Sequence, residues 1–85
     1  MPEVRVFVRT ADQARKAEVT MSRENTGGDV IQSAVSNWSL PTDTDYTLVN
    51  TANQKAILPS QVLTEERVKD GDVLEVQPVL VAGGQ

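Results

Sequence analysis

The residues of this chain whose types and spacing suggest chemistry lie at its end, in Val81-Ala82-Gly83-Gly84-Gln85. Neither glycine carries a Cβ, so this segment can thread a narrow enzyme channel and present a nearly unhindered carboxylate. The sequence therefore predicts either a chemical handle for another enzyme or a frayed, glycine-rich terminus. Which of the two applies depends on the body that positions the tail.

The rest of the chain offers little for catalysis. It contains no histidine and no cysteine, which removes the usual general base, the usual thiol nucleophile and the commonest metal ligands. Its serines have no histidine to activate them. The acid pairs Glu65-Glu66 and Asp70/Asp72 fall in predicted exposed turns, where we expect them to be solvated. We therefore expect no enzyme activity, no metal site and no cofactor.

Composition limits the class of protein. Eighty-five residues suit one small domain, and 39% apolar with 24% charged residues is ordinary for a folded chain. The net charge of −4 disfavours nucleic acid and anionic membranes as partners. The start of the chain does not resemble a signal peptide and no apolar run is long enough to span a membrane, so we expect a cytoplasmic monomer.

The first elements read as a β-hairpin. Residues 4–10 alternate strictly, with valines on one face and Arg5, Phe7 and Arg9 on the other. Residues 12–15 read as a turn, and residues 17–22 alternate again.

A helix follows the hairpin. Thr26 with Asp29 three residues later matches a capping box. The apolar stripe that predicts one amphipathic helix consists of Val30, Ile31, Ala34, Val35 and Trp38. The helix should end near Ser39, because Pro41 biases the residue before it away from helical dihedrals.

The second half of the chain reads as returning strands at 46–49, 55–58 and 73–77, with one helical turn over 63–68. The order β-β-α-β-β-turn-β predicts an α+β roll whose helix packs across a mixed sheet of four to five strands. We expect one domain over residues 1–77 and a flexible tail over 78–85.

Two motifs have more than one interpretation. Thr26-Gly27-Gly28 before a helix suits a phosphate at the helix N-terminus, although a plain cap is favoured because no lysine follows as in a P-loop. Arg5, Phe7 and Arg9 place an aromatic ring between two cations, which suits single-stranded nucleic acid. In an acidic domain with one aromatic there, a protein-contact or solvated face is favoured.

These segments resemble ubiquitin and its relatives, which share the β-grasp fold. Residues 4–10 resemble the opening strand of ubiquitin, including the outward aromatic, and residues 63–69 with 74–76 are similar to its last turn and final strand. Residues 69–76 also resemble the short bacterial ubiquitin-like proteins related to YukD and EsaB. The resemblance spans nearly the whole chain.

The resemblance implies a bacterial-type protein modifier made as a precursor. Gln85 would be removed by a processing peptidase, and Gly83-Gly84 would then be conjugated through the Gly84 carboxylate to amines on target proteins. A partner activating enzyme would use ATP, and a conjugating enzyme and a deconjugating peptidase would be further partners. Partner-binding residues would be Phe7 and Val49 on the sheet with Val79, Leu80 and Val81 on the arm. The candidate acceptors for chains are the lysines Lys16, Lys55 and Lys69.

Two departures from ubiquitin matter for partner choice. The tail is about one residue longer and carries no arginine, which indicates a dedicated activating enzyme. The expected outward sheet positions keep only part of an apolar patch, so ordinary ubiquitin-binding domains should bind poorly; these positions are Phe7, Thr47, Val49, Glu75 and Gln77.

Three other functions remain open from the sequence. The first is a non-conjugated docking module, as in YukD/EsaB-like components of secretion systems. The second is a sulfur carrier with a Gly-Gly thiocarboxylate, although such proteins normally end at the second glycine. The third is deamidation of Gln85 and ligation through its side chain, as in Pup, whose disordered and helical body differs from the strands expected here.

Overall fold

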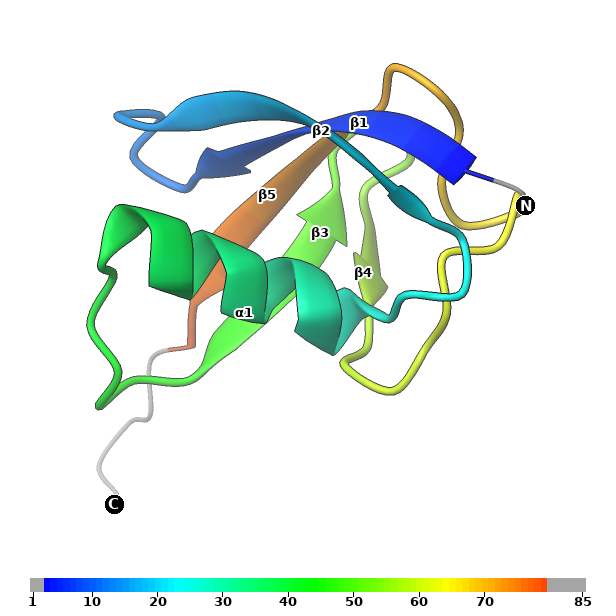
Figure 1. Cartoon of the computed structure of the whole chain (residues 1–85). Coiled ribbons are helices and arrows are strands. Elements are labelled where there is room, and N and C mark those ends of the chain that lie inside the picture. Colours follow the sequence, from blue (N-terminus) through cyan, green and yellow to red (C-terminus); the bar gives the residue numbers. More distant parts are fainter. Residues whose placement is uncertain (1–2, 80–85) are drawn as a thin grey trace.

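The computed structural model describes residues 3–79 and shows a five-stranded mixed sheet crossed by one helix (Figure 1). The strand order is β2-β1-β5-β3-β4, with β1 and β5 parallel and every other neighbouring pair antiparallel. The predicted α+β roll is therefore confirmed, with five strands. The elements are β1 (Glu3–Thr10), β2 (Lys16–Ser22), α1 (Gly27–Trp38), β3 (Tyr46–Asn50), β4 (Lys55–Ile57) and β5 (Val73–Pro78).

The β1–β2 hairpin forms as its alternation predicts. Val4, Val6 and Val8 are at most 3% exposed, while the intervening side chains lie on the opposite face. The connecting turn is closed by the Thr10 N–H, which donates to the Arg15 carbonyl at 3.0 Å. Gln13 takes the left-handed conformation that completes this turn, with φ of 61°.

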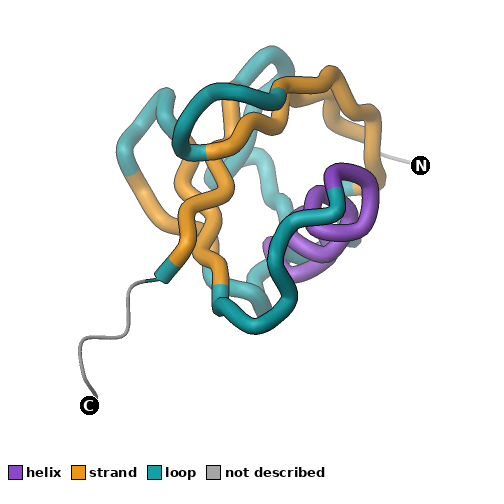
Figure 2. Tube along the Cα trace, turned by 90° about the vertical axis from the view of Figure 1, so that its left-hand side faces the viewer, coloured by secondary structure: helices purple, strands orange, loops and turns teal. Residues whose placement is uncertain are grey.

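The helix lies across the face that carries these valines (Figures 1 and 2). Thr26 accepts a hydrogen bond from the Asp29 N–H, and the Asp29 carboxylate accepts one from the Thr26 N–H, so the predicted capping box is confirmed. Val30 and Ala34 are buried against the sheet, and Trp38 packs partly buried at the edge of the core. The helix ends at Ser39 in the left-handed region, where the sequence predicted its end.

The returning strands complete the core. Leu48, Leu74 and Val76 are at most 1% exposed and face the helix beside the hairpin valines. Four strands are one residue longer than predicted: β1 and β2 each begin one residue earlier, β3 includes Asn50, and β5 includes Pro78, which pairs with Tyr46. β4 is one residue shorter than predicted and ends at Ile57. β5 is the central strand of the sheet, between β1 and β3.

The segment between β4 and β5 forms the predicted turn with both apolar ends inward. Leu63 and Val68 are each 0% exposed. The Val68 N–H donates to the Thr64 carbonyl at 2.9 Å, an i to i+4 bond that makes one helical turn without a regular helix. The Arg23 guanidinium fixes this turn from β2's end by donating to the Leu63 and Val68 carbonyls at 3.1 and 2.8 Å.

Candidate functional site

The open face of the sheet, on the side away from α1, carries the surface that the sequence singled out. Phe7 on β1 is the register partner of Val73 on β5, and Val49 on β3 is the partner of Ala56 on β4. Phe7 and Val49 are both half-buried, because side chains on neighbouring strands cover part of each. The predicted outward placement of Phe7 and Val49 is therefore confirmed.

An ion pair on this face borders both apolar pairs. The Arg9 Nε donates to the Glu75 Oε2 at 3.0 Å, and both side chains are largely covered, at 26% and 13% exposed. Glu75 is the register partner of both Arg9 and Val49, and the Gln77 amide donates to its other oxygen. The open face is therefore of mixed character, with charged and polar groups beside Val49 rather than one continuous apolar surface.

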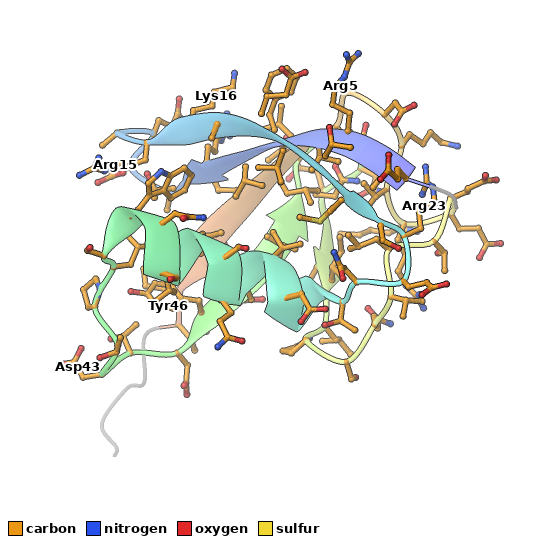
Figure 3. All side chains as sticks on the ribbon, viewed as in Figure 1. Arg5, Arg15, Lys16, Arg23, Asp43 and Tyr46 are labelled. Atoms are coloured by element: carbon orange, nitrogen blue, oxygen red, sulfur yellow. The ribbon has the colours of Figure 1, made fainter. Side chains whose placement is uncertain are left out.

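Lysine and arginine side chains frame the β2 end of the open face. The Lys16 ammonium lies 5.2 Å from the centre of the Phe7 ring, a cation–π geometry. Arg5 pairs with Glu18 at 3.2 Å in an exposed ion pair. Figure 3 shows Arg5 and Lys16 pointing away from the helix. Phe7 is therefore partnered within the chain, which favours the protein-contact interpretation of Arg5, Phe7 and Arg9 over base stacking.

Sequence reasoning missed one apolar residue at this edge. Leu58 follows β4 directly. It is 54% exposed, the highest value among the large apolar side chains of residues 3–79. Its position two residues after the outward Ala56 was the available signal, since alternation continues beyond the last paired residue. Leu58 is therefore an exposed apolar side chain directly after the edge strand β4.

The arm leaves the body from the central strand. Val79 follows β5, donates its N–H to the Asp45 carbonyl at 2.8 Å and is 41% exposed. The predicted conjugation and processing residues, and two of the arm residues, lie outside the described part of the chain; these are Leu80, Val81, Gly83, Gly84 and Gln85.

The three lysines are not brought together. Lys16 lies on β2, Lys55 begins β4, and Lys69 lies in the turn before β5; all three are exposed. Lys69 also contributes to that turn through its backbone, because its N–H donates to the Asp72 carboxylate at 2.8 Å.

The helix N-terminus is a plain cap. The Gly27 N–H donates to the Gln61 carbonyl at 2.9 Å and the Gly28 N–H to the Pro59 carbonyl at 3.1 Å, while the Asp29 N–H is taken by Thr26. The amides a phosphate would need are therefore engaged within the chain. A Cβ on Gly27 would lie 2.7 Å from the Leu58 carbonyl oxygen, so close packing explains why glycine is needed there.

The acid pair before β5 differs in part from expectation. We expected Asp70 and Asp72 to be solvated; Asp70 is exposed as expected and Asp72 is half-buried, and both carboxylates accept bonds that hold the turn. Asp70 accepts from the Arg5 N–H at 2.9 Å, and Asp72 accepts from the buried Asn50 amide at 2.9 Å. Their role is structural, because they satisfy backbone and core donors that would otherwise lose water on folding.

The Asp12 carboxylate has a lowered pKa. The Thr10 hydroxyl donates to it at 2.6 Å and the Ala14 N–H at 3.0 Å, and these bonds to the charged form lower its pKa below 3.8. The group is exposed and closes a turn. Within residues 3–79, no three acidic side chains are grouped as a metal site, and no helix is long and apolar enough to cross a membrane.

No protein-family model matches this sequence, and no curated protein matches it either. Many solved structures do. An ubiquitin of Caldiarchaeum subterraneum matches with a TM-score of 0.75 at 22% identity, covering 96% of this chain and all of that one. A protein designed on the basis of ubiquitin matches with a TM-score of 0.75 at 17% identity, covering 98% of this chain and 96% of the design.

A third structure is the N-terminal ubiquitin-like domain of the 4931431F19Rik protein. It matches with a TM-score of 0.70 at 17% identity and covers 98% of this chain and 81% of that one. The strand order, the single crossing helix and these three likenesses agree: this chain has the ubiquitin-like β-grasp fold.

Proposed function

We propose that this protein is a ubiquitin-like modifier of the bacterial type, processed after Gly84 and conjugated through the Gly84 carboxylate to amines on target proteins. One observation supports this most: the arm that ends in Gly83-Gly84 follows directly from the central strand of a ubiquitin-like β-grasp body. Fold alone does not imply function, so the proposal rests on the combination of body and tail.

The arm is attached to the sheet in a way that suits a segment bound by enzymes. β5 is hydrogen-bonded to β1 on one side and to β3 on the other, and Val79 adds one more bond to Asp45. An enzyme that binds the residues after Val79 therefore acts on the central strand of the sheet, which is bonded on both sides, rather than on an edge strand. We expect the β-grasp domain to stay folded when an enzyme binds the tail.

The chemistry belongs to the partners. In an activating enzyme, a Gly84 carboxylate oxygen attacks the α-phosphorus of ATP and pyrophosphate leaves. A cysteine thiolate of the enzyme then displaces AMP and forms a thioester. A target amine displaces the thiolate, forms the isopeptide bond and loses a proton. This chain contributes the carboxylate, the narrow glycine pair and the surface that selects the enzyme.

The open face is the proposed selecting surface, through Phe7 and Val49 together with Val79 and the arm. The ion pair of Arg9 with Glu75 lies beside Val49 on this face, which favours a partner that matches apolar and charged groups together. Such a partner is the dedicated activating enzyme that the arginine-free arm calls for. The bacterial assignment rests on the resemblance of residues 69–76 to YukD/EsaB-like proteins.

The experiment is isolation of the N-terminally tagged protein from its native host under denaturing conditions, followed by cleavage after glutamate. A conjugated target lysine then carries residues 76–84, because Glu75 is the last glutamate before the tail. We expect this remnant for the wild type and for a chain lacking only Gln85. Deletion of Gly83 to Gln85 should abolish it. Absence of the remnant from both competent chains contradicts the proposal.

The same mass measurement separates the other functions. Retention of Gln85 together with normal function after deletion of Gly83 to Gln85 indicates a docking module. Exchange of one oxygen for sulfur at Gly84 indicates a sulfur carrier. Conversion of Gln85 to glutamate, with linkage through its side chain, indicates deamidation and ligation.

A further inference from the structure

A cavity lies beside the point where the arm leaves the body. Its volume is about 310 Å³, and its walls come from the end of β1 and the turn after it, the loop between α1 and β3, the start of β3, and the last residues of β5. The residues that line it include Ala11, Leu40, Pro41, Tyr46 and Pro78. The volume is near the lower limit of roughly 300–1,000 Å³ for ligand pockets, so it suits one or two side chains.

The cavity walls are held in place by bonds within the chain. The Tyr46 hydroxyl donates to the Pro41 carbonyl at 2.8 Å, which fixes the loop across the strand. The Leu40 N–H donates to the Val35 carbonyl at 3.1 Å as the helix ends, and Leu40 packs against the core. Pro78 is paired with Tyr46 in the sheet. A preformed apolar hollow of this kind loses little entropy when a side chain enters it.

The rim of the cavity is acidic. Asp12 lines it, and Asp43 and Asp45 are exposed in the loop that supplies Pro41. Arg15 lies near Asp12 and offsets part of this charge. Figure 3 shows Asp43, Tyr46 and Arg15 at the same end of the molecule. An apolar hollow edged by carboxylates complements an apolar side chain flanked by basic residues.

Pro78 is both a wall of the cavity and the last residue of β5, and Val79 is bonded to Asp45 on the rim. A protein that binds the chain at Val79 therefore lies beside the cavity. We propose that the enzyme engaging the arm inserts a leucine- or phenylalanine-sized side chain, flanked by arginine or lysine, into this cavity. The inference rests on the proposed function, because it names a contact of the enzyme that handles the same arm.

The test uses a variant that fills the cavity from its rim and a matched control. Ala11→Trp places an indole at a lining position of the exposed turn, whereas Ala14→Trp places one on the same turn at a residue outside the cavity lining. Both positions are exposed, so both variants should keep the wild-type unfolding midpoint. A third variant, Asp43→Lys with Asp45→Lys, reverses the rim charge.

The binding measurement uses a defined probe, the peptide acetyl-Arg-Leu-Arg-amide, titrated into the full ¹⁵N-labelled chain. We expect saturable shifts at Leu40 and Tyr46, weakened about tenfold by Ala11→Trp and by the rim reversal and unchanged by Ala14→Trp, as for loss of a central apolar anchor. Acetyl-Arg-Ala-Arg-amide should bind more weakly. Equal binding by the two tryptophan variants overturns the inference.

The functional measurement is the rate at which the remnant of residues 76–84 appears on target lysines in native-host extract with ATP. We expect about a tenfold loss for Ala11→Trp and wild-type rate for Ala14→Trp. If wild type forms conjugates and the two variants are equal, the docking inference fails and the modifier proposal stands. If wild type and the chain lacking Gln85 form none, the modifier proposal fails and the docking inference fails with it.

The same variants also test two other possible occupants of the cavity. If deletion of residues 80–85 is required before the peptide binds, the chain's own arm fills the cavity and the enzyme contact is wrong. If sedimentation shows a wild-type dimer that Ala11→Trp abolishes, a second copy fills it instead.

Discussion

The two faces of the sheet are built from the same strands but have different consequences. On the face under α1, the apolar side chains that β1, β3 and β5 contribute to the core are at most 3% exposed; these are Val4, Val6, Val8, Leu48, Leu74 and Val76. On the open face, the same strands carry half-buried residues, among them Phe7, Val49 and the ion pair of Arg9 with Glu75. The covered face stabilises the fold through core packing. Residues on the open face contribute less to the core, so their types can be set by the partner that binds there.

The largest expected effect is on the covered face. Leu74→Ala removes a side chain that is 0% exposed in the central strand, and we expect a loss of about 2–5 kcal/mol in the free energy of unfolding. Val49→Ala, on β3 facing the other way, is the matched control. Because Val49 is only half-buried, its truncation should cost much less. Urea unfolding measures both, and equal losses would contradict the division between the faces.

A buried polar residue provides the second prediction. Asn50 is 0% exposed at the end of β3, where its amide donates to the Arg67 carbonyl at 2.8 Å and to Asp72 at 2.9 Å. Its side-chain oxygen accepts from the Ala52 N–H at 2.9 Å. Asn50→Ala should cost about 1–3 kcal/mol, because it leaves buried partners unsatisfied.

The same variant should also loosen the segment that Asn50 holds. Amide exchange should rise over residues 63–72, while β1 and β2 change less, because the lost bonds all reach that segment or the adjacent turn. Asn53→Ala is the control, since Asn53 is exposed and makes one bond, to the Lys55 N–H at 3.0 Å. A uniform rise across the whole chain would argue against a local role for Asn50.

Alternation explains how much of the fold was predictable. The strands, the capped helix and the inward residues follow from period-2 and period-3.6 patterns, which are local in the sequence. Asn50 was missed because its bonds reach residues 17 and 22 positions further on, and the predicted strand ended one residue earlier. Arg23 was missed for the same reason, since its two carbonyl partners lie beyond residue 60.

The candidate site was predictable only in part. Phe7 and Val49 were placed outward by alternation alone. The cavity beside the arm was not foreseen, because it depends on three segments far apart in the sequence meeting at one end of the sheet. Its loop wall falls between predicted elements, where local patterns carry little information.

The open face offers a smaller test, because it carries two ion pairs of unequal burial. Arg9 and Glu75 are 26% and 13% exposed, whereas Arg5 and Glu18 are 63% and 50% exposed. A double-mutant cycle with glutamine at Arg9 and Glu75 should give a coupling of about 0.5–1 kcal/mol. The same cycle at Arg5 and Glu18 should give a value near zero, because water screens that pair. Equal couplings would mean that burial does not distinguish the pairs.

The smallest expected effect lies where the covered face ends in a polar residue. Thr10 follows Val4, Val6 and Val8 on that face, and its hydroxyl donates to Asp12, which lowers the pKa of the Asp12 carboxyl below 3.8. A lowered pKa in the folded state means that ionised Asp12 stabilises the fold at neutral pH. That contribution must fade as the pH falls through the folded-state pKa.

Asp12→Asn should therefore lower the unfolding midpoint slightly at pH 7, and the gap to wild type should close as the pH falls below about 3.8. Thermal unfolding followed by circular dichroism from pH 2 to 7 measures the gap, and NMR titration of the Asp12 carboxyl carbon measures its pKa directly. A gap that widens toward acid would show that the Thr10 hydroxyl does not favour the charged form. The bond from Thr10 to Asp12 would then fix the geometry of the turn after β1 without adding stability that depends on the charge of Asp12.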